Sequence, residues 1–177
     1  MLEFFDYSNR RGVMVQFLPG VHALLLNNSQ KDKLACLPPP EHIITWQQRL
    51  RNELLDINRR FLIAVNKTEP RRPGEKNANV AGVFFYRYSG NDIYIEELQI
   101  AWDLRNDPQV LEGLMKKLEF DIGTKEVTFF AGERIKVESD KEQLAAKLLT
   151  KTNAENWENL GNLKAAINAL KFRYNRS

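Results

Sequence analysis

Residues 80–122 read VAGVFFYRYSGNDIYIEELQIAWDLRNDPQVLEGLMKKLEFDI, and this stretch decides the fold class. It begins with two runs, 80–88 and 93–101, that are rich in the β-branched and aromatic residues favoured in strands. The residues between them, Ser89-Gly90-Asn91-Asp92, are typical turn formers. Two such runs on either side of a short turn predict an antiparallel β-hairpin.

A helix is predicted directly after the hairpin. Asp107 is a favoured N-cap residue, and Pro108 is favoured at the first helical position. Apolar residues then recur at helical spacing as far as Gly123, a natural helix stop: Leu111, Leu114, Met115, Leu118 and Ile122. Residues 126–130 follow as a predicted strand. A helix of this length between two strands implies a parallel crossover in a largely antiparallel sheet.

Upstream of the hairpin, the apolar run 61–65 predicts a buried strand. A helix is predicted from the prolines at 38–40 onward, with an apolar stripe that consists of Ile43, Trp46, Leu50, Leu54 and Ile57. Nearer the N-terminus, three runs separated by turn-forming residues are each consistent with a short strand: 2–7, 13–18 and 21–26.

Downstream, two capping boxes predict helix starts: Ser139 with Glu142, and Thr152 with Glu155. The second opens a predicted helix in which Gly161 marks a candidate break. The apolar face of that helix consists of Trp157, Leu160, Leu163, Ile167 and Leu170. Together these elements predict the fold class α/β. The expected sheet mixes parallel and antiparallel pairs, as in α+β proteins, and helices flank both of its faces.

The composition is that of an ordinary globular protein. Of the 177 residues, 43% are hydrophobic and 28% are charged, so we expect one folded domain over 1–177. The net charge of +3 is too small for a dedicated nucleic-acid binder. No apolar run approaches the roughly 18 residues that cross a membrane, and Glu3 and Asp6 argue against a signal peptide. The single cysteine, Cys36, favours a reducing compartment and hence the cytoplasm.

Motifs for nucleotide, metal or disulfide chemistry are absent from the sequence. It contains no G-x-x-x-x-G-K-[ST], G-x-G-x-x-G, H-E-x-x-H or C-x-x-C. His22, His42 and Cys36 are too few for a structural zinc site, so no metal is predicted. Three Arg-Arg pairs are interpreted as solvated or capping charges, with nucleic-acid contact as a minor alternative.

Residues 97–105, ELQIAWDLR, resemble the central strand and turn of the GNAT family of N-acyltransferases. The family's pattern runs acid, Leu, any, Val, any, Pro, acid, aromatic, Arg, and then a glycine-rich turn. The positions that match are Leu98, Ile100, Asp103 and Arg105. Trp102 replaces the usual proline, and Leu104 replaces the usual aromatic residue. The order of elements over 60–174 is also similar to that of the family, with 1–57 as a variable N-terminal part.

The resemblance implies the transfer of an acetyl or other acyl group from coenzyme A, as acetyl-CoA, to an amine of a small molecule or protein. In the family, the backbone of the central strand pairs with the pantetheine arm. The pyrophosphate lies at the start of the next helix. The candidate cofactor-binding residues are therefore Leu98, Ile100, Arg105, Gln109, Val110 and, from the last helix, Asn162.

An acid on or near the central strand takes the amine proton in many members of the family. Glu96 and Glu97 are the candidate bases here. Neighbouring strand residues point to opposite faces, so we expect only one of them to face the acceptor. The alternative, in which both are ordinary solvated or ion-paired residues, stays open. In the family, a tyrosine on the last helix is often the general acid for the departing thiolate. Ile167 stands nearest to that position here, so Tyr174 is the candidate general acid instead.

The turn at 105–110 departs from the family's glycine-rich pattern. Pro108, which has no N–H, stands where the first glycine is expected, and Asp107 would accept an amide hydrogen bond that a phosphate needs. Val110 adds a branched side chain to the approach. Changing these three residues to glycine is therefore predicted to tighten acetyl-CoA binding. The alternatives to a divergent acyltransferase are a GNAT-like binding or assembly module without coenzyme A, and an unrelated α/β protein such as a nucleic-acid accessory factor.

Overall fold

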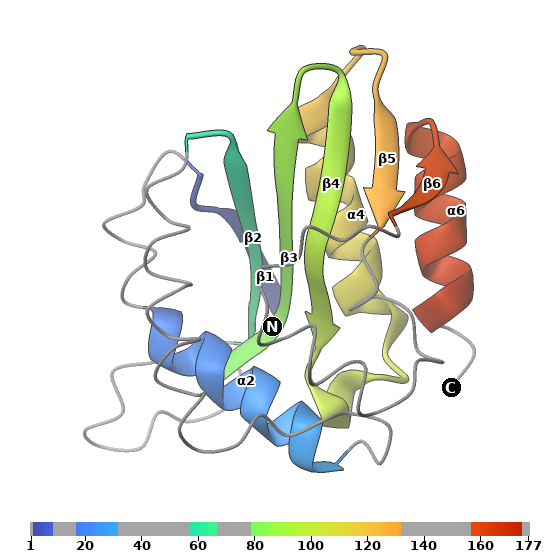
Figure 1. Ribbon diagram of the computed structural model, residues 1–177. Helices are drawn as coiled ribbons and strands as arrows, with labels where there is room; N and C mark the ends of the chain where they lie inside the picture. Colours follow the sequence, from blue (N-terminus) through green and yellow to red (C-terminus); the bar gives the residue numbers. More distant parts are fainter. Residues whose placement is uncertain (1, 9–16, 32–56, 67–78, 132–156, 175–177) are drawn as a thin grey trace.

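Within the part of the chain that the structure describes, six strands form one sheet, and their order in space is their order in sequence (Figure 1). The computed structural model describes residues 2–8, 17–31, 57–66, 79–131 and 157–174. The strands are β1 (Leu2–Asp6), β2 (Arg59–Asn66), β3 (Asn79–Ser89), β4 (Asp92–Ile100), β5 (Thr128–Ala131) and β6 (Glu158–Gly161). β4 and β5 are parallel, and all other neighbours are antiparallel. The predicted buried strand, hairpin and parallel crossover are confirmed.

Helices cover both faces of this sheet. Among the described residues they are α2 (Leu18–Lys31), η2 (a 3₁₀ helix, Trp102–Leu104), α4 (Pro108–Ile122) and α6 (Leu163–Tyr174). Leu62 of β2 packs in one core with α4 and α6, whereas its neighbours Phe61 and Ile63 pack in a second core with α2. Figure 1 shows α2 crossing its face of the sheet near the ends of β3 and β4. The predicted class, α/β with helices on both faces, is confirmed.

The start and the end of α4 follow from the local sequence. The Asp107 carboxylate accepts a hydrogen bond from the Gln109 N–H at 2.9 Å, and Pro108 is the first helical residue. Gly123 ends the helix with a φ of 60°, a left-handed value that favours glycine. All five residues of the predicted apolar stripe are buried. The predicted helix and both of its ends are confirmed.

The N-terminal region differs from the prediction. β1 confirms the first predicted strand, but residues 21–26 lie within the helix α2, so a strand there is wrong. Pro19 and Gly20 suggest a turn, yet proline is tolerated in the first turn of a helix. Among the α2 side chains that the structure describes, the buried ones follow helical spacing: Leu18, Val21, Leu24 and Asn28. Leu18, the last residue of the second predicted strand, begins α2, and Ile57, predicted on an apolar helix stripe, is an exposed turn residue. Residues 13–16 and the rest of the helix predicted before Ile57 lie outside the described residues.

The C-terminal region also differs from the prediction. The helix expected to run on from Thr152 is wrong at residues 158–161, which form β6 and pair antiparallel with β5. Gly161, with a φ of 84°, ends the strand. Asn162 then caps α6, because its side chain accepts a hydrogen bond from the Ala165 N–H at 2.9 Å. Pairing with β5 overrides the local helical pattern here, and both capping boxes lie outside the described residues.

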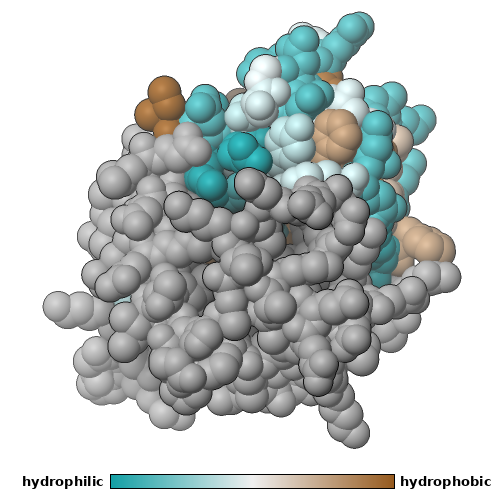
Figure 2. Space-filling model, in the orientation of Figure 1, coloured by the Kyte–Doolittle hydropathy of each residue, from teal (hydrophilic) through white to brown (hydrophobic). Residues whose placement is uncertain are grey.

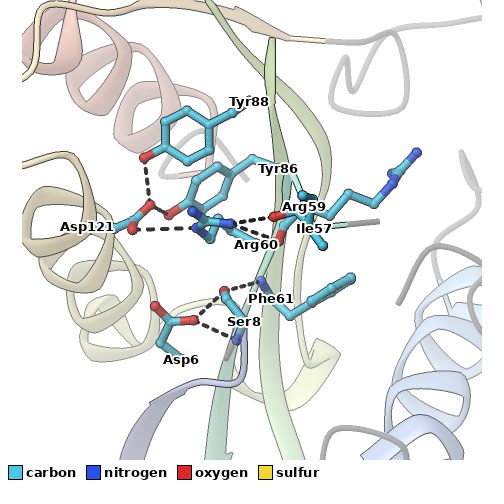
Figure 3. Close-up of polar contacts among 9 residues, drawn as sticks. All are labelled: Asp6, Ser8, Ile57, Arg59, Arg60, Phe61, Tyr86, Tyr88 and Asp121. Atoms are coloured by element: carbon cyan, nitrogen blue, oxygen red, sulfur yellow. Dashed lines mark hydrogen bonds and ion pairs between the residues drawn. The ribbon is translucent and has the colours of Figure 1, made fainter. Parts of the chain in front are cut away.

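A largely buried carboxylate ties α4 to the sheet (Figure 3). Asp121 accepts hydrogen bonds from the Tyr86 hydroxyl at 2.5 Å and from the Tyr88 hydroxyl at 2.8 Å. The Arg60 guanidinium lies over the Tyr88 ring, and its Nε is 3.7 Å from Asp121 Oδ1. Burial, together with the neighbouring Asp121 carboxylate, raises the pKa of both tyrosines above their ordinary value of about 10.

We expect Tyr86→Phe to lower the free energy of unfolding by about 1–3 kcal/mol, because Asp121 then loses a buried donor. The pH dependence should change as well. Below about pH 10 the tyrosines are neutral in both states, whereas above it the unfolded chain ionises first, so stability is lost as pH rises. Urea unfolding at neutral pH and at about pH 10.5 should show a smaller alkaline loss for Tyr86→Phe than for the wild type. Equal losses in the two proteins would contradict the raised pKa of Tyr86.

The described surface seen in the orientation of Figure 1 is mostly hydrophilic, with hydrophobic side chains that stand apart from one another (Figure 2). The large apolar side chains exposed among the described residues are Ile57, Phe120 and Phe172. Isolated apolar side chains of this kind are normal for a folded protein. None of the described helices is both long and apolar enough to cross a membrane.

Candidate functional site

A β-bulge interrupts β4 at Glu96. Phe85 of β3 pairs with Glu97, and the next residue, Tyr86, pairs with Ile95, so the register skips Glu96. One extra residue on one strand makes a bulge, and bulges redirect side chains next to functional sites. This bulge therefore sets the direction of the two adjacent carboxylates on the central strand.

Glu96 lies between two arginines on the α2 side of the sheet. Its carboxylate forms ion pairs with Arg59 of β2 and with Arg87 of β3, the latter with an Nε–Oε1 distance of 3.2 Å. Each arginine is two residues from a phenylalanine of the α2 core, Phe61 or Phe85, so both arginines point to that face. Glu96 is thus an ion-paired residue of the α2 face.

Glu97 points to the same face. Its cross-strand partner Phe85 belongs to the α2 core, and its Oε1 accepts a hydrogen bond from Gln99 Nε2 at 3.1 Å. Glu97 is buried, with 7% of its surface exposed. The expectation that only one of the two glutamates faces this side is wrong, because the bulge breaks the strict alternation of a strand.

Asn28 of α2 connects this face to the end of β4. Its amide nitrogen donates to the Ile100 carbonyl at 2.8 Å and to Gln99 Oε1 at 3.1 Å. Its amide oxygen accepts from the Trp102 N–H at 2.9 Å. A chain of hydrogen bonds therefore runs from the backbone through Asn28 and Gln99 to Glu97. Sequence reasoning missed Asn28, since its partners lie 71 to 74 residues away and no local motif marks them.

Aromatic rings lie next to the ion pairs of Glu96. The Tyr94 ring stacks with Phe130 at 5.2 Å between centroids, and it meets Trp157 edge-on at 5.0 Å. The Arg87 guanidinium, which pairs with Glu96, lies over Tyr94 at 4.9 Å. Around Glu96, the α2 face therefore joins a carboxylate, two guanidinium groups and partly exposed aromatic rings.

The second half of β4 extends past its parallel partner. In the described chain, β5 pairs with β4 only over 92–95. The Ala101 N–H bonds to the Ala81 carbonyl at 2.8 Å, so the Ile100 carbonyl of the same trans peptide points away from β3. Backbone groups alternate along a strand, so the N–H and C=O of Leu98 point the same way. Leu98 and Ile100 therefore share the edge of β4 on which pantetheine contacts are predicted.

The turn before α4 has few backbone N–H groups to offer a phosphate. The Asp107 carboxylate takes the Gln109 N–H, and Pro108 has none to offer. Val110 is fully buried, and its Cγ1 lies 2.8 Å from where a Cβ on Gly82 would be. The prediction of Val110 as a cofactor contact is wrong for its side chain, because that side chain belongs to the core.

The other predicted residues lie apart from the two glutamates. The Arg105 guanidinium lies over the Trp102 ring at 4.1 Å, next to the turn. Asn162 and Tyr174 stand at opposite ends of α6, which packs against the other face of the sheet. Among the described residues, no group of three His, Cys, Asp or Glu side chains is placed to hold a metal ion.

A GNAT-family acetyltransferase of Staphylococcus aureus Mu50 has a similar structure, with a TM-score of 0.53 and 13% identity over 92% of this chain and 99% of that chain. This chain has the GNAT fold. The PaiA N-acetyltransferase of Thermoplasma acidophilum, in complex with coenzyme A, aligns with a TM-score of 0.49 and 15% identity over 76% of this chain and 81% of that one. No protein-family model and no curated protein matches the sequence. The predicted resemblance is confirmed at the level of the fold.

The two ends of the coenzyme A site that the GNAT fold implies differ in their fit. The edge of β4 can bond an amide, as the Asn28 side chain does at Ile100 and Trp102, and the Ile100 carbonyl keeps a second lone pair for another donor. The turn does not suit a pyrophosphate. Asp107 uses one of the amides at the start of α4 and would set a negative charge beside the phosphates.

Proposed function

We propose that this chain is a divergent GNAT-type N-acyltransferase, which transfers an acetyl or other acyl group from coenzyme A to an amine of a small molecule or protein. The observation that carries the proposal is the bulge of β4, which sets Glu96 and Glu97 on one face. Both carboxylates stand directly before Leu98, which shares with Ile100 the edge of β4 proposed to bind pantetheine. The proposed proton acceptor, Glu97, is thus followed directly in sequence by the strand edge proposed to bind the acyl donor. The GNAT fold supports the same class of reaction.

Glu97 is the proposed general base. An amine that attacks an acyl group loses a proton, and a placed carboxylate contributes about 10²- to 10⁴-fold to the rate. Glu96 is less suited to this role, because two guanidinium groups hold its oxygens. We propose instead that Glu96, with Arg59 and Arg87, shapes the acceptor side of the site.

Coenzyme A supplies the acyl group as a thioester when it is bound. We propose that the backbone of Leu98 and Ile100 holds its pantetheine arm, as an added strand would. Arg105 and Gln109 are the proposed neighbours of its phosphates, and binding there is expected to be weak. Asn162 is a weaker candidate, since its oxygen caps α6. Tyr174 is proposed as the general acid only on the basis of its position in the sequence.

Thermal unfolding in the presence of acetyl-CoA, free coenzyme A or a nucleic acid tests this proposal. A ligand that binds only the folded state raises the melting temperature. We expect both thioester and free coenzyme A to raise it and the nucleic acid to leave it unchanged. Transfer is then measured as release of the free thiol with a panel of amines that includes a polyamine, an aminoglycoside and a short peptide.

Neither metal nor membrane is proposed, and the single Cys36 supports a cytoplasmic location.

The second candidate is a GNAT-like binding or assembly module that has lost coenzyme A. One observation favours it: Asp107 caps α4 where a cofactor phosphate would need the amide. An unchanged melting temperature with millimolar acetyl-CoA, together with no thiol release, would favour this module over the enzyme. A rise with nucleic acid alone would contradict both candidates.

A further inference from the structure

The Asn28 side chain bonds to β4 as one residue of a neighbouring strand would. A strand residue donates its N–H to a facing carbonyl and accepts, through its own C=O, from an N–H further along. The Asn28 amide does both, with the Ile100 carbonyl and the Trp102 N–H. Backbone groups cannot exchange donor and acceptor, so these two bonds decide which end of the Asn28 amide is nitrogen.

This orientation passes along the chain of hydrogen bonds to Glu97. The Asn28 nitrogen also donates to Gln99 Oε1, so the oxygen of Gln99 faces Asn28 and its nitrogen faces Glu97. Glu97 Oε1 therefore meets a donor and has to accept. Asn28 is 9% exposed and Glu97 is 7% exposed, so water competes weakly for these bonds.

We propose that Asn28 is a positioning residue of the transfer site, which fixes Glu97 as a proton acceptor through Gln99. The inference rests on the proposed function for the role of Glu97, and it adds a residue from α2 to the site. The donor on Gln99 favours the charged form of Glu97. The other charged groups on this face include Glu96, Arg59 and Arg87, with Glu3 of β1 and Asp92 at the start of β4 farther along the sheet, and none of the variants below changes them.

Asn28→Asp reverses the chain of hydrogen bonds and so tests the inference. A carboxylate at position 28 still accepts from the Trp102 N–H but has no N–H for Gln99 or for the Ile100 carbonyl. Gln99 is then expected to turn its nitrogen toward position 28 and its oxygen toward Glu97, which favours the protonated form of Glu97. The pKa of Glu97, followed by ¹³C NMR of labelled glutamate carboxyls without ligand, should rise by at least about one unit. The acid limb of the pH profile of kcat should move by the same amount.

Asn27→Asp is the matched control, because it adds the same charge one residue away on α2, at a partly exposed position. Circular dichroism establishes that each variant folds. A folded Asn28→Asp protein whose Glu97 pKa moves no more than in the control would overturn the inference. If Asn28→Asp does not fold, Gln99→Leu decides, since loss of the donor should also raise the Glu97 pKa and an unchanged value would overturn the inference. Failure of the proposed function looks different: the pKa moves as expected, but the wild type transfers no acyl group.

Discussion

Replacing Glu97 by glutamine is expected to lower kcat for acyl transfer by about 10²- to 10⁴-fold. Glutamine keeps the size of the side chain and still accepts from Gln99, but it cannot take a proton from an amine. Calorimetry should therefore give an affinity for acetyl-CoA within about twofold of the wild type, which places the loss in kcat. Thiol release at saturating acetyl-CoA measures kcat with whichever amine the wild type accepts.

Glu96→Gln is the control for this prediction, since it changes the neighbouring carboxylate on the same face. It should cost much less in kcat. It should cost more in stability, because it removes the charged partner of Arg59 and Arg87. A loss of kcat for Glu96→Gln equal to or larger than that for Glu97→Gln would show that Glu97 is not the base.

Changing Asp107 to glycine and Pro108 to alanine is expected to tighten acetyl-CoA binding at least about tenfold, a gain of about 1.4 kcal/mol. The pair frees the Gln109 N–H, adds one backbone N–H at position 108 and removes a carboxylate from the start of α4. Val110 stays in place. The sequence alone suggested glycine there too, but Val110 is fully buried, and glycine would leave a cavity in the core.

Calorimetry on the wild type and the double variant measures this gain. Asn159→Gly serves as the control, because it removes an exposed side-chain hydrogen bond to a backbone N–H, that of Gly161, and leaves the turn before α4 unchanged. A folded double variant with unchanged affinity would mean that the turn is not what weakens binding. A sub-micromolar dissociation constant of the wild type for acetyl-CoA would show more directly that the turn does not weaken binding.

The central elements could be predicted from the sequence because their signals act over a few residues. The turn formers at 89–92 allow the chain to reverse, and Asp107 and Pro108 begin α4 through contacts within one helical turn. The apolar stripe of α4 repeats at helical spacing whatever it packs against. The GNAT-like motif after Glu97 is local in the same sense. It was therefore enough to identify the central strand, and the cofactor contacts of Leu98 and Ile100 stay a prediction.

The arrangement of the site was decided by tertiary structure. Glu96 and Glu97 share a face because β3 pairs past the bulge, and alternation within β4 alone predicts the opposite. Asn28 reaches β4 only because a stretch near Pro19 forms a helix that packs on the sheet. Residues 158–161 form a strand because β5 offers them an edge. In each case the deciding partner lies on another element of the fold, so the free energy of pairing or burial that selects the conformation leaves no pattern within the segment itself.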